Sequence, residues 1–134
     1  MTGDPVAVAQ SSFGRCREAP DFFPTFYAEL LVRCPAARPM FAKTDFDRQN
    51  KLLDHAIGLL LNFSRQPGSP PNILSRVAGR HSRADLNVSP ELYPFFVDSL
   101  VAAVRKFDPK FDADTEAAWR TATGDGVAYM ASKY

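Results

Sequence analysis

The chain has 134 residues, enough for one domain that buries about two thirds of its unfolded surface in a single core. Hydrophobic residues make up 46% of it, with eleven Phe, four Tyr and one Trp, which excludes a disordered chain. A formal net charge of +1 gives no field that would attract nucleic acid or an anionic membrane. The sequence has no apolar run of about eighteen residues and no signal-peptide pattern at its start. We therefore expect one cytoplasmic domain over residues 1–134, with neither nucleic acid nor a membrane as partner.

The two cysteines, Cys16 and Cys34, lie on different predicted helices and have no metal-ligand spacing. A reducing compartment would keep both as thiols. We interpret them as small core or near-surface residues.

The first part of the chain predicts two helices followed by a proline corner. The opening helix runs from Pro5 to about Arg17. Asp21 can cap a second helix that ends near Arg33. The inner face of this second helix is unusually aromatic and holds Phe23, Phe26, Tyr27, Leu30 and Leu31. Residues 34–41 contain two prolines and allow only a short turn of helix.

A long helix is expected from about Asp45 to Phe63. Its inner face is predicted to hold Gln49, Leu52, Leu53, Ala56, Ile57, Leu60 and Leu61. Gln49 is the polar exception at the start of this apolar stripe. His55 falls outside the stripe, and we interpret it as a surface histidine.

The next helix carries the second of the two histidines. A loop over residues 66–71 precedes it, because three of its six residues are proline. Ile73, Val77 and His81 recur at i, i+4 and i+8, so they share one helix face, with Leu74 beside them. A histidine at the end of an apolar face is either a core residue bonded to a backbone carbonyl or a ligand for a metal or cofactor.

Two further helices complete the chain. Ser89 caps one that includes Pro90 and ends near Phe107, with a possible bend at Pro94. Asp112 or Asp114 caps the last helix, whose inner face is predicted to hold Trp119, Ala122, Val127 and Met130. Gly124 and Gly126 weaken the middle of this helix, so we expect another element to pack closely there.

No segment shows the alternation of a strand, so the fold class is all-α. The helices differ in length and are joined by proline corners rather than by short symmetric loops. This pattern favours helices that cross obliquely around a pocket over an up-and-down bundle.

The order of several segments resembles that of the globin family, especially bacterial single-domain globins and the haem domains of flavohaemoglobins. The segments are TFYAELL, PMF, RQNKLLDHAI, GRHSRADLNVSPELYP and EAAWRTATGDGVAYM, and the resemblance covers nearly the whole chain from about Asp21. It implies a three-over-three globin fold around one b-type haem.

The resemblance also implies roles for individual residues. His81 is the proximal ligand of haem iron through its Nε2 atom. Tyr27 and Gln49 match the distal pair that hydrogen-bonds a bound diatomic gas, although Tyr27 alternatively fits a core position and Gln49 a solvated first turn. Phe41 and Leu53 match the aromatic wedge and the wall of the pocket, and both suit a core in either case. The remaining haem contacts that we expect are Val77, Arg80, Tyr93 and Phe96.

On this resemblance we expect reversible binding of oxygen, and also of nitric oxide or carbon monoxide. Two hydrogen-bond donors in a dry pocket favour oxygen, which becomes polar when bound to ferrous iron, over the less polar carbon monoxide. The alternatives are a nitric oxide dioxygenase that uses an external reductase and a haem-based gas sensor module. The resting iron is either five-coordinate or six-coordinate, and a six-coordinate state gives His55 a second interpretation. The protein is expected to be a monomer or a homodimer.

The chain departs from the flavohaemoglobin pattern in two places. Its last helix ends in ASKY, with Tyr134 near the position of the family's glutamate. Residues 82–92 are about two residues longer than the matching stretch. These departures argue against a proximal hydrogen-bond relay and against peroxidase-like chemistry.

Overall fold

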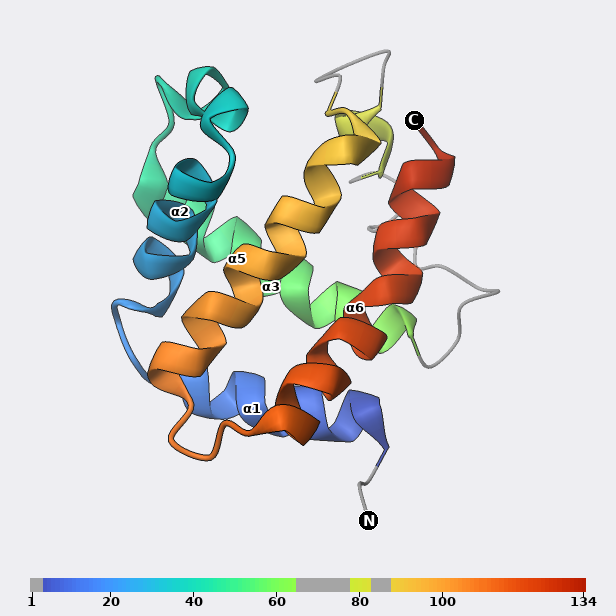
Figure 1. Ribbon diagram of the computed structural model, residues 1–134. Helices are drawn as coiled ribbons and strands as arrows, with labels where there is room; N and C mark the ends of the chain where they lie inside the picture. Colours follow the sequence, from blue (N-terminus) through green and yellow to red (C-terminus); the bar gives the residue numbers. More distant parts are fainter. Residues whose placement is uncertain (1–3, 65–77, 83–87) are drawn as a thin grey trace.

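The computed structural model describes residues 4–64, 78–82 and 88–134, and all regular structure in these ranges is helical (Figure 1). The helices are α1 (Pro5–Arg17), α2 (Phe22–Arg33), the 3₁₀ helix η1 (Pro35–Phe41), α3 (Phe46–Phe63), the 3₁₀ helix η2 (Pro90–Leu92), α5 (Tyr93–Phe107) and α6 (Ala113–Ser132). Residues 78–81 are helical as well. The predicted all-α class is confirmed.

Aspartate side chains cap α3 and α6, whereas Asp21, the cap expected for α2, makes no side-chain capping hydrogen bond. Asp45 accepts a hydrogen bond from the Arg48 backbone N–H at the start of α3. Asp112, rather than Asp114, caps α6 by accepting from the Thr115 N–H at 2.8 Å. These carboxylates satisfy backbone N–H groups that the first turn of a helix leaves without partners.

The helix predicted from Pro90 to Phe107 is divided into η2 and α5. Ser89 accepts a hydrogen bond from the Glu91 N–H and so caps η2, as expected. Pro94 falls in the first turn of α5 rather than inside a continuous helix. Proline suits this position because its missing N–H would have no partner there in any case. The bend that we expected at Pro94 is therefore a boundary between two helices.

The helices cross one another obliquely. Helix α2 lies along α5, while α1 runs across the base of α6 (Figure 1). Helix α3 crosses behind α5 and α6 in this view and contacts α1, α2 and α6. The largest fully buried side chains come from α1, α2, α3, α5 and α6, so one core joins these helices; they include Phe22, Phe26, Ile57, Leu61, Leu100, Val104 and Trp119.

The inner face of α3 is narrower than the sequence predicted. Leu53, Ile57, Leu60 and Leu61 are buried as expected, but Leu52 is 52% exposed. Consecutive residues lie about 100° apart around a helix, so Leu52 lies on the flank of the stripe centred on Leu53. The prediction that Leu52 faces the core is wrong.

Close packing against α6 occurs at one of the two predicted glycines. A Cβ atom at Gly126 would overlap the side chain of Leu60 on α3, whereas a Cβ atom at Gly124 would have no neighbour within 4 Å. Gly126 thus permits α3 and α6 to approach each other, and the expectation for Gly124 is wrong.

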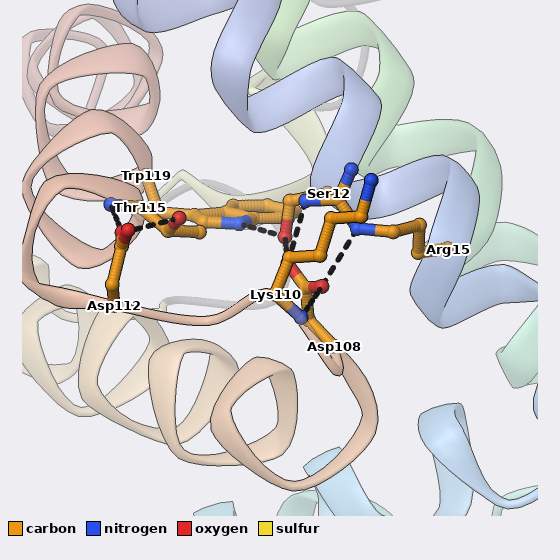
Figure 2. Close-up of polar contacts among 7 residues, drawn as sticks. All are labelled: Ser12, Arg15, Asp108, Lys110, Asp112, Thr115 and Trp119. Carbon is orange, nitrogen blue, oxygen red and sulfur yellow. Dashed lines mark hydrogen bonds and ion pairs between the residues drawn. The ribbon is translucent and has the colours of Figure 1, made fainter. Parts of the chain in front are cut away.

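Helix α1 is tied to the turn between α5 and α6 by buried polar contacts (Figure 2). Asp108 accepts hydrogen bonds from Ser12 and Arg15, and Ser12 accepts one from the indole N–H of Trp119.

Cys16 on the same helix is a buried free thiol, as is Cys34. In the described part of the chain, no helix has the length and apolar character that crossing a membrane requires.

Candidate functional site

Tyr27 is a buried polar residue of α2 that lies among aromatic rings facing α3. Its side chain is 4% exposed, and the Gln49 side chain of α3 lies near enough to the phenol to influence its pKa. Burial raises the pKa of Tyr27 to about 12, although Gln49 opposes this shift. At neutral pH Tyr27 is therefore an uncharged phenol that retains a proton to donate. The structure brings together Tyr27 and Gln49, the predicted distal pair.

Two phenylalanines enclose the Tyr27 ring. The centroid of Phe41, at the end of η1, lies 5.5 Å from that of Tyr27. Phe46, the first residue of α3, lies 5.3 Å from Tyr27 and stacks on Phe41 at an interplanar angle of 26°. Aromatic rings at these distances attract each other, and Phe46, which is 37% exposed, forms the solvent side of the group. The η1 corner therefore places Phe41 beside Tyr27.

Leu53 and Phe96 extend this apolar region. Leu53 is buried in the same hydrophobic cluster as Tyr27, and Phe41 and Phe96 are partly buried against it. The Phe96 ring of α5 lies 5.3 Å from that of Phe26 on α2. Four predicted site residues, Tyr27, Phe41, Leu53 and Phe96, thus belong to one packed region.

Tyr93 lies in a second cluster, towards the helical segment that carries His81. Its buried neighbours there include Ala78, three residues before His81, together with Leu60, Phe63 and Met130. Phe96 packs against this cluster too, so it connects the two regions. Burial raises the pKa of Tyr93 and keeps its phenol neutral.

His81 ends the helical segment 78–81 and is half-buried. Its backbone carbonyl accepts a hydrogen bond of 2.9 Å from the Val88 N–H. The Val88 backbone thus lies against the end of this segment, just before η2. Arg80 is exposed. Val77 and the predicted face formed with Ile73 and Leu74 lie outside the described residues.

His55 lies on the exposed side of α3, which confirms its predicted surface position. Within residues 4–64, 78–82 and 88–134, no three His, Cys, Asp or Glu side chains come close enough to hold a metal ion. His81 offers a single imidazole. A lone histidine at the end of a helix suits a metal whose other ligands come from a cofactor, as in haem.

A partly open cavity of about 240 Å³, which we call the α2–α3 cavity, lies beside Tyr27 and was not predicted from the sequence. Its lining residues are Pro24, Tyr27, Ala28, Leu31, Phe46 and Asn50. Phe46 and Asn50 lie four residues apart on α3 and so share a face, a spacing that was visible in the sequence. Asn50 carries a buried side-chain oxygen, Oδ1, that has no hydrogen-bond partner among the described residues.

Comparisons with known proteins agree with this geometry. The family model described as Globin matches residues 24–130. A crystal structure of protein PA3967 from Pseudomonas aeruginosa PAO1, described as structurally highly homologous to a human haemoglobin, is 37% identical in sequence. It superposes with a TM-score of 0.91 and covers 97% of this chain and 98% of that one. No curated protein matches.

Proposed function

The chain belongs to the globin family, and from this premise we propose that it binds haem b through His81 and uses Tyr27 and Gln49 to favour oxygen as its gas ligand. Family membership supports haem-based gas binding in general. The globin fold predicted from the sequence is confirmed by the structural match. The particular ligand and the role of each residue are the proposal.

The observation that carries the proposal is the buried phenol of Tyr27, with the half-buried Gln49 near it and the rings of Phe41 and Phe46 beside it. Haem supplies the iron atom at which a diatomic gas binds. A neutral phenol that keeps its proton is a suitable donor to a gas ligand, because burial raises the pKa of Tyr27 to about 12. Phe41 beside it offers a flat apolar surface of the kind that a porphyrin face requires. The residues present therefore fit haem.

The distal side discriminates between gases through polarity. A donor held in an apolar setting interacts more strongly with a polar ligand than the same donor does in water. With haem held by His81, oxygen would be the more polar gas ligand and would gain more from Tyr27 than carbon monoxide would. Gln49, whose side chain lowers the pKa of Tyr27, is proposed to orient the phenol by donating to its oxygen. Leu53 closes the pocket with apolar surface.

On the proximal side, His81 supplies the imidazole ligand. Tyr93 and Phe96 are proposed to line that side, since Tyr93 packs with Ala78 from the His81 segment. Arg80 is exposed next to His81 and is proposed to meet a haem propionate. Val77 completes the proposed contacts from its place in the sequence, one helical turn before His81.

Visible absorption spectra test the proposal. Protein purified with haem supplied should show a Soret band that shifts on reduction and again under carbon monoxide. His81→Ala should lose stable haem binding and regain it with added imidazole. His55→Ala is the matched control, because His55 is exposed, and it should bind haem as the wild type does. Normal haem retention by His81→Ala without imidazole would refute the ligand assignment.

A further inference from the structure

Four basic side chains from η1 to the second turn of α3 have no part in the proposed function. They are exposed, and none of the ion pairs among the described residues includes them: Arg38, Lys43, Arg48 and Lys51. By contrast, every arginine and lysine of α1, α2, α5 and α6 is held in an ion pair. We call these four residues the basic patch. Its charges are not compensated within the described part of the chain.

The basic patch stands out from a chain that is otherwise nearly neutral. Two aspartates lie in the same stretch, and one of them, Asp45, is engaged as the cap of α3. Four cations against Asp45 and Asp47 leave residues 38–51 with a formal charge of +2. Because the whole chain carries +1, its remaining residues together carry −1. Such a local field reaches about 8 Å at physiological ionic strength and attracts a partner of opposite sign.

Helix α3 adds exposed apolar surface to the basic patch. One face of this helix holds exposed residues at i, i+3, i+4 and i+7, which are Arg48, Lys51, Leu52 and His55. Leu52 is 52% exposed, and Met40 near the end of η1 is 42% exposed. Apolar side chains among uncompensated cations suit brief docking of an acidic protein, because charge speeds the encounter and apolar contact holds the partner in place.

The basic patch adjoins the proposed gas site. Helix η1 and the start of α3 form the upper left corner of the molecule in Figure 1, beside α2. Phe41 and Phe46 of this corner pack on Tyr27, and Gln49 directly follows Arg48. A protein docked on the basic patch therefore lies close to the distal residues. The propionates of haem are too few to pair with all four cations.

We propose that the basic patch docks an acidic one-electron donor protein, which returns oxidised haem iron to the ferrous state. The inference rests on the proposed function, because oxygen binds to ferrous iron. The step moves one electron from the reduced centre of the partner, which is oxidised, to ferric iron, which is reduced. No bond forms or breaks. The residues of the basic patch bind and orient the partner and take no part in the transfer itself.

Reduction of the ferric, haem-bound protein by a reduced plant-type ferredoxin tests the inference, because this ferredoxin is acidic and has a low reduction potential. Stopped-flow absorption measures the rate. At low ionic strength, Lys43→Glu, Arg48→Glu and Lys51→Glu should each slow reduction by roughly 2- to 5-fold. These differences should disappear near about 1 M salt, where the Debye length is about 3 Å.

Lys133→Glu is the matched control, since it makes the same change of charge at an exposed residue. Lys133 follows α6 near the C-terminus, away from η1 and the start of α3 in Figure 1. Lys133→Glu should change the rate by less than about 1.5-fold, because charges farther apart than the Debye length are screened. Equal slowing by all four variants, or slowing that salt does not remove, would overturn the inference.

Binding of oxidised ferredoxin supplies a readout that does not depend on electron transfer. In nuclear magnetic resonance of the haem-bound protein under carbon monoxide, ferredoxin should shift the backbone amides of residues 38–51. The amides at the end of α6 should not move. Arg48→Glu should weaken this binding by roughly 2- to 5-fold at low ionic strength. Shifts confined to another surface would overturn the inference.

Further outcomes separate the inference from its alternatives. If the three patch variants lose haem faster than the wild type, the cations serve the haem propionates and the inference fails. If they reduce binding to phosphatidylserine vesicles but leave reduction by ferredoxin unchanged, the patch meets an anionic membrane and the inference fails. If His81→Ala loses haem while the patch variants are reduced at the wild-type rate, the proposed function stands and the docking role is refuted. A wild type that binds no haem refutes both.

Discussion

The Ser12 hydroxyl of α1 donates a 2.6 Å hydrogen bond to Oδ2 of Asp108, which lies 96 residues later in the chain. Ser12 in turn accepts a 2.9 Å hydrogen bond from the indole N–H of Trp119 (Figure 2). Arg15 completes the arrangement with two bonds to the Asp108 carboxylate, at 2.7 and 2.9 Å. All of these polar groups come from α1, α6 or the turn before α6. The network therefore fixes α1 on the rest of the helices.

Removing the Asp108 charge should destabilise the fold. Asp108→Asn keeps the shape of the side chain but places an amide N–H₂ group against Arg15. Because the carboxylate is fully buried and bonded, we expect a loss of about 2–3 kcal/mol in the free energy of unfolding. Asp98→Asn is the control, since Asp98 pairs with Arg120 at the surface and should cost less than about 1 kcal/mol. Urea unfolding followed by circular dichroism measures both.

Acid should weaken the protein through the same carboxylate. Burial raises the pKa of Asp108, but the hydrogen bonds from Arg15 and Ser12 outweigh it and lower the pKa from 3.8 to about 2. A carboxyl group whose pKa is lower in the folded than in the unfolded protein stabilises the fold at pH values above its unfolded-state pKa. This stabilisation is lost as the pH falls through its folded-state pKa. Asp108 should therefore contribute about 2 kcal/mol above pH 4 that disappears towards pH 2. The wild type should lose stability more steeply than Asp108→Asn over this range, and parallel curves would contradict the assignment.

The two glycines of α6 should respond differently to alanine. Gly124→Ala should raise the free energy of unfolding by about 0.5–1 kcal/mol, because its Cβ meets nothing and alanine favours helix. Gly126→Ala gains the same preference but drives the buried Leu60 side chain out of its place. We expect Gly126→Ala to be about 1–3 kcal/mol less stable than Gly124→Ala. Equal stabilities would show that Leu60 moves aside without strain.

Local patterns predicted most of the fold. The bounds of α1, α2 and α3 follow from prolines and from Asp45, because capping and chain breaking act within a few residues. The Tyr27, Phe41 and Gln49 group was identified through the family resemblance, and the structure brings the three together. By contrast, the Ser12–Asp108 bond depends on how distant segments meet, which helical periodicity does not encode.

The α2–α3 cavity shows a different limit. Phe46 and Asn50 have the spacing of a shared helix face, but that face has meaning only once α2 lies opposite it. The prediction that Leu52 is buried was wrong for a related reason. An apolar residue on the flank of an apolar helix face is buried only where a neighbouring helix covers it. Periodicity indicates which residues share a face and leaves open what covers that face.

Tyr27→Phe should identify the distal donor directly. Phenylalanine keeps the ring that packs against Phe41 and Phe46 and removes only the hydroxyl. We expect the oxygen dissociation rate to rise by roughly 10-fold, while that of carbon monoxide changes by less than about twofold, because only oxygen becomes polar enough to gain from the phenol. Stopped-flow mixing and flash photolysis measure the two rates. Tyr129→Phe, whose ring packs on Phe63 in the other cluster, is the control and should leave both unchanged. Equal changes for the two gases in Tyr27→Phe would place the hydroxyl away from the gas.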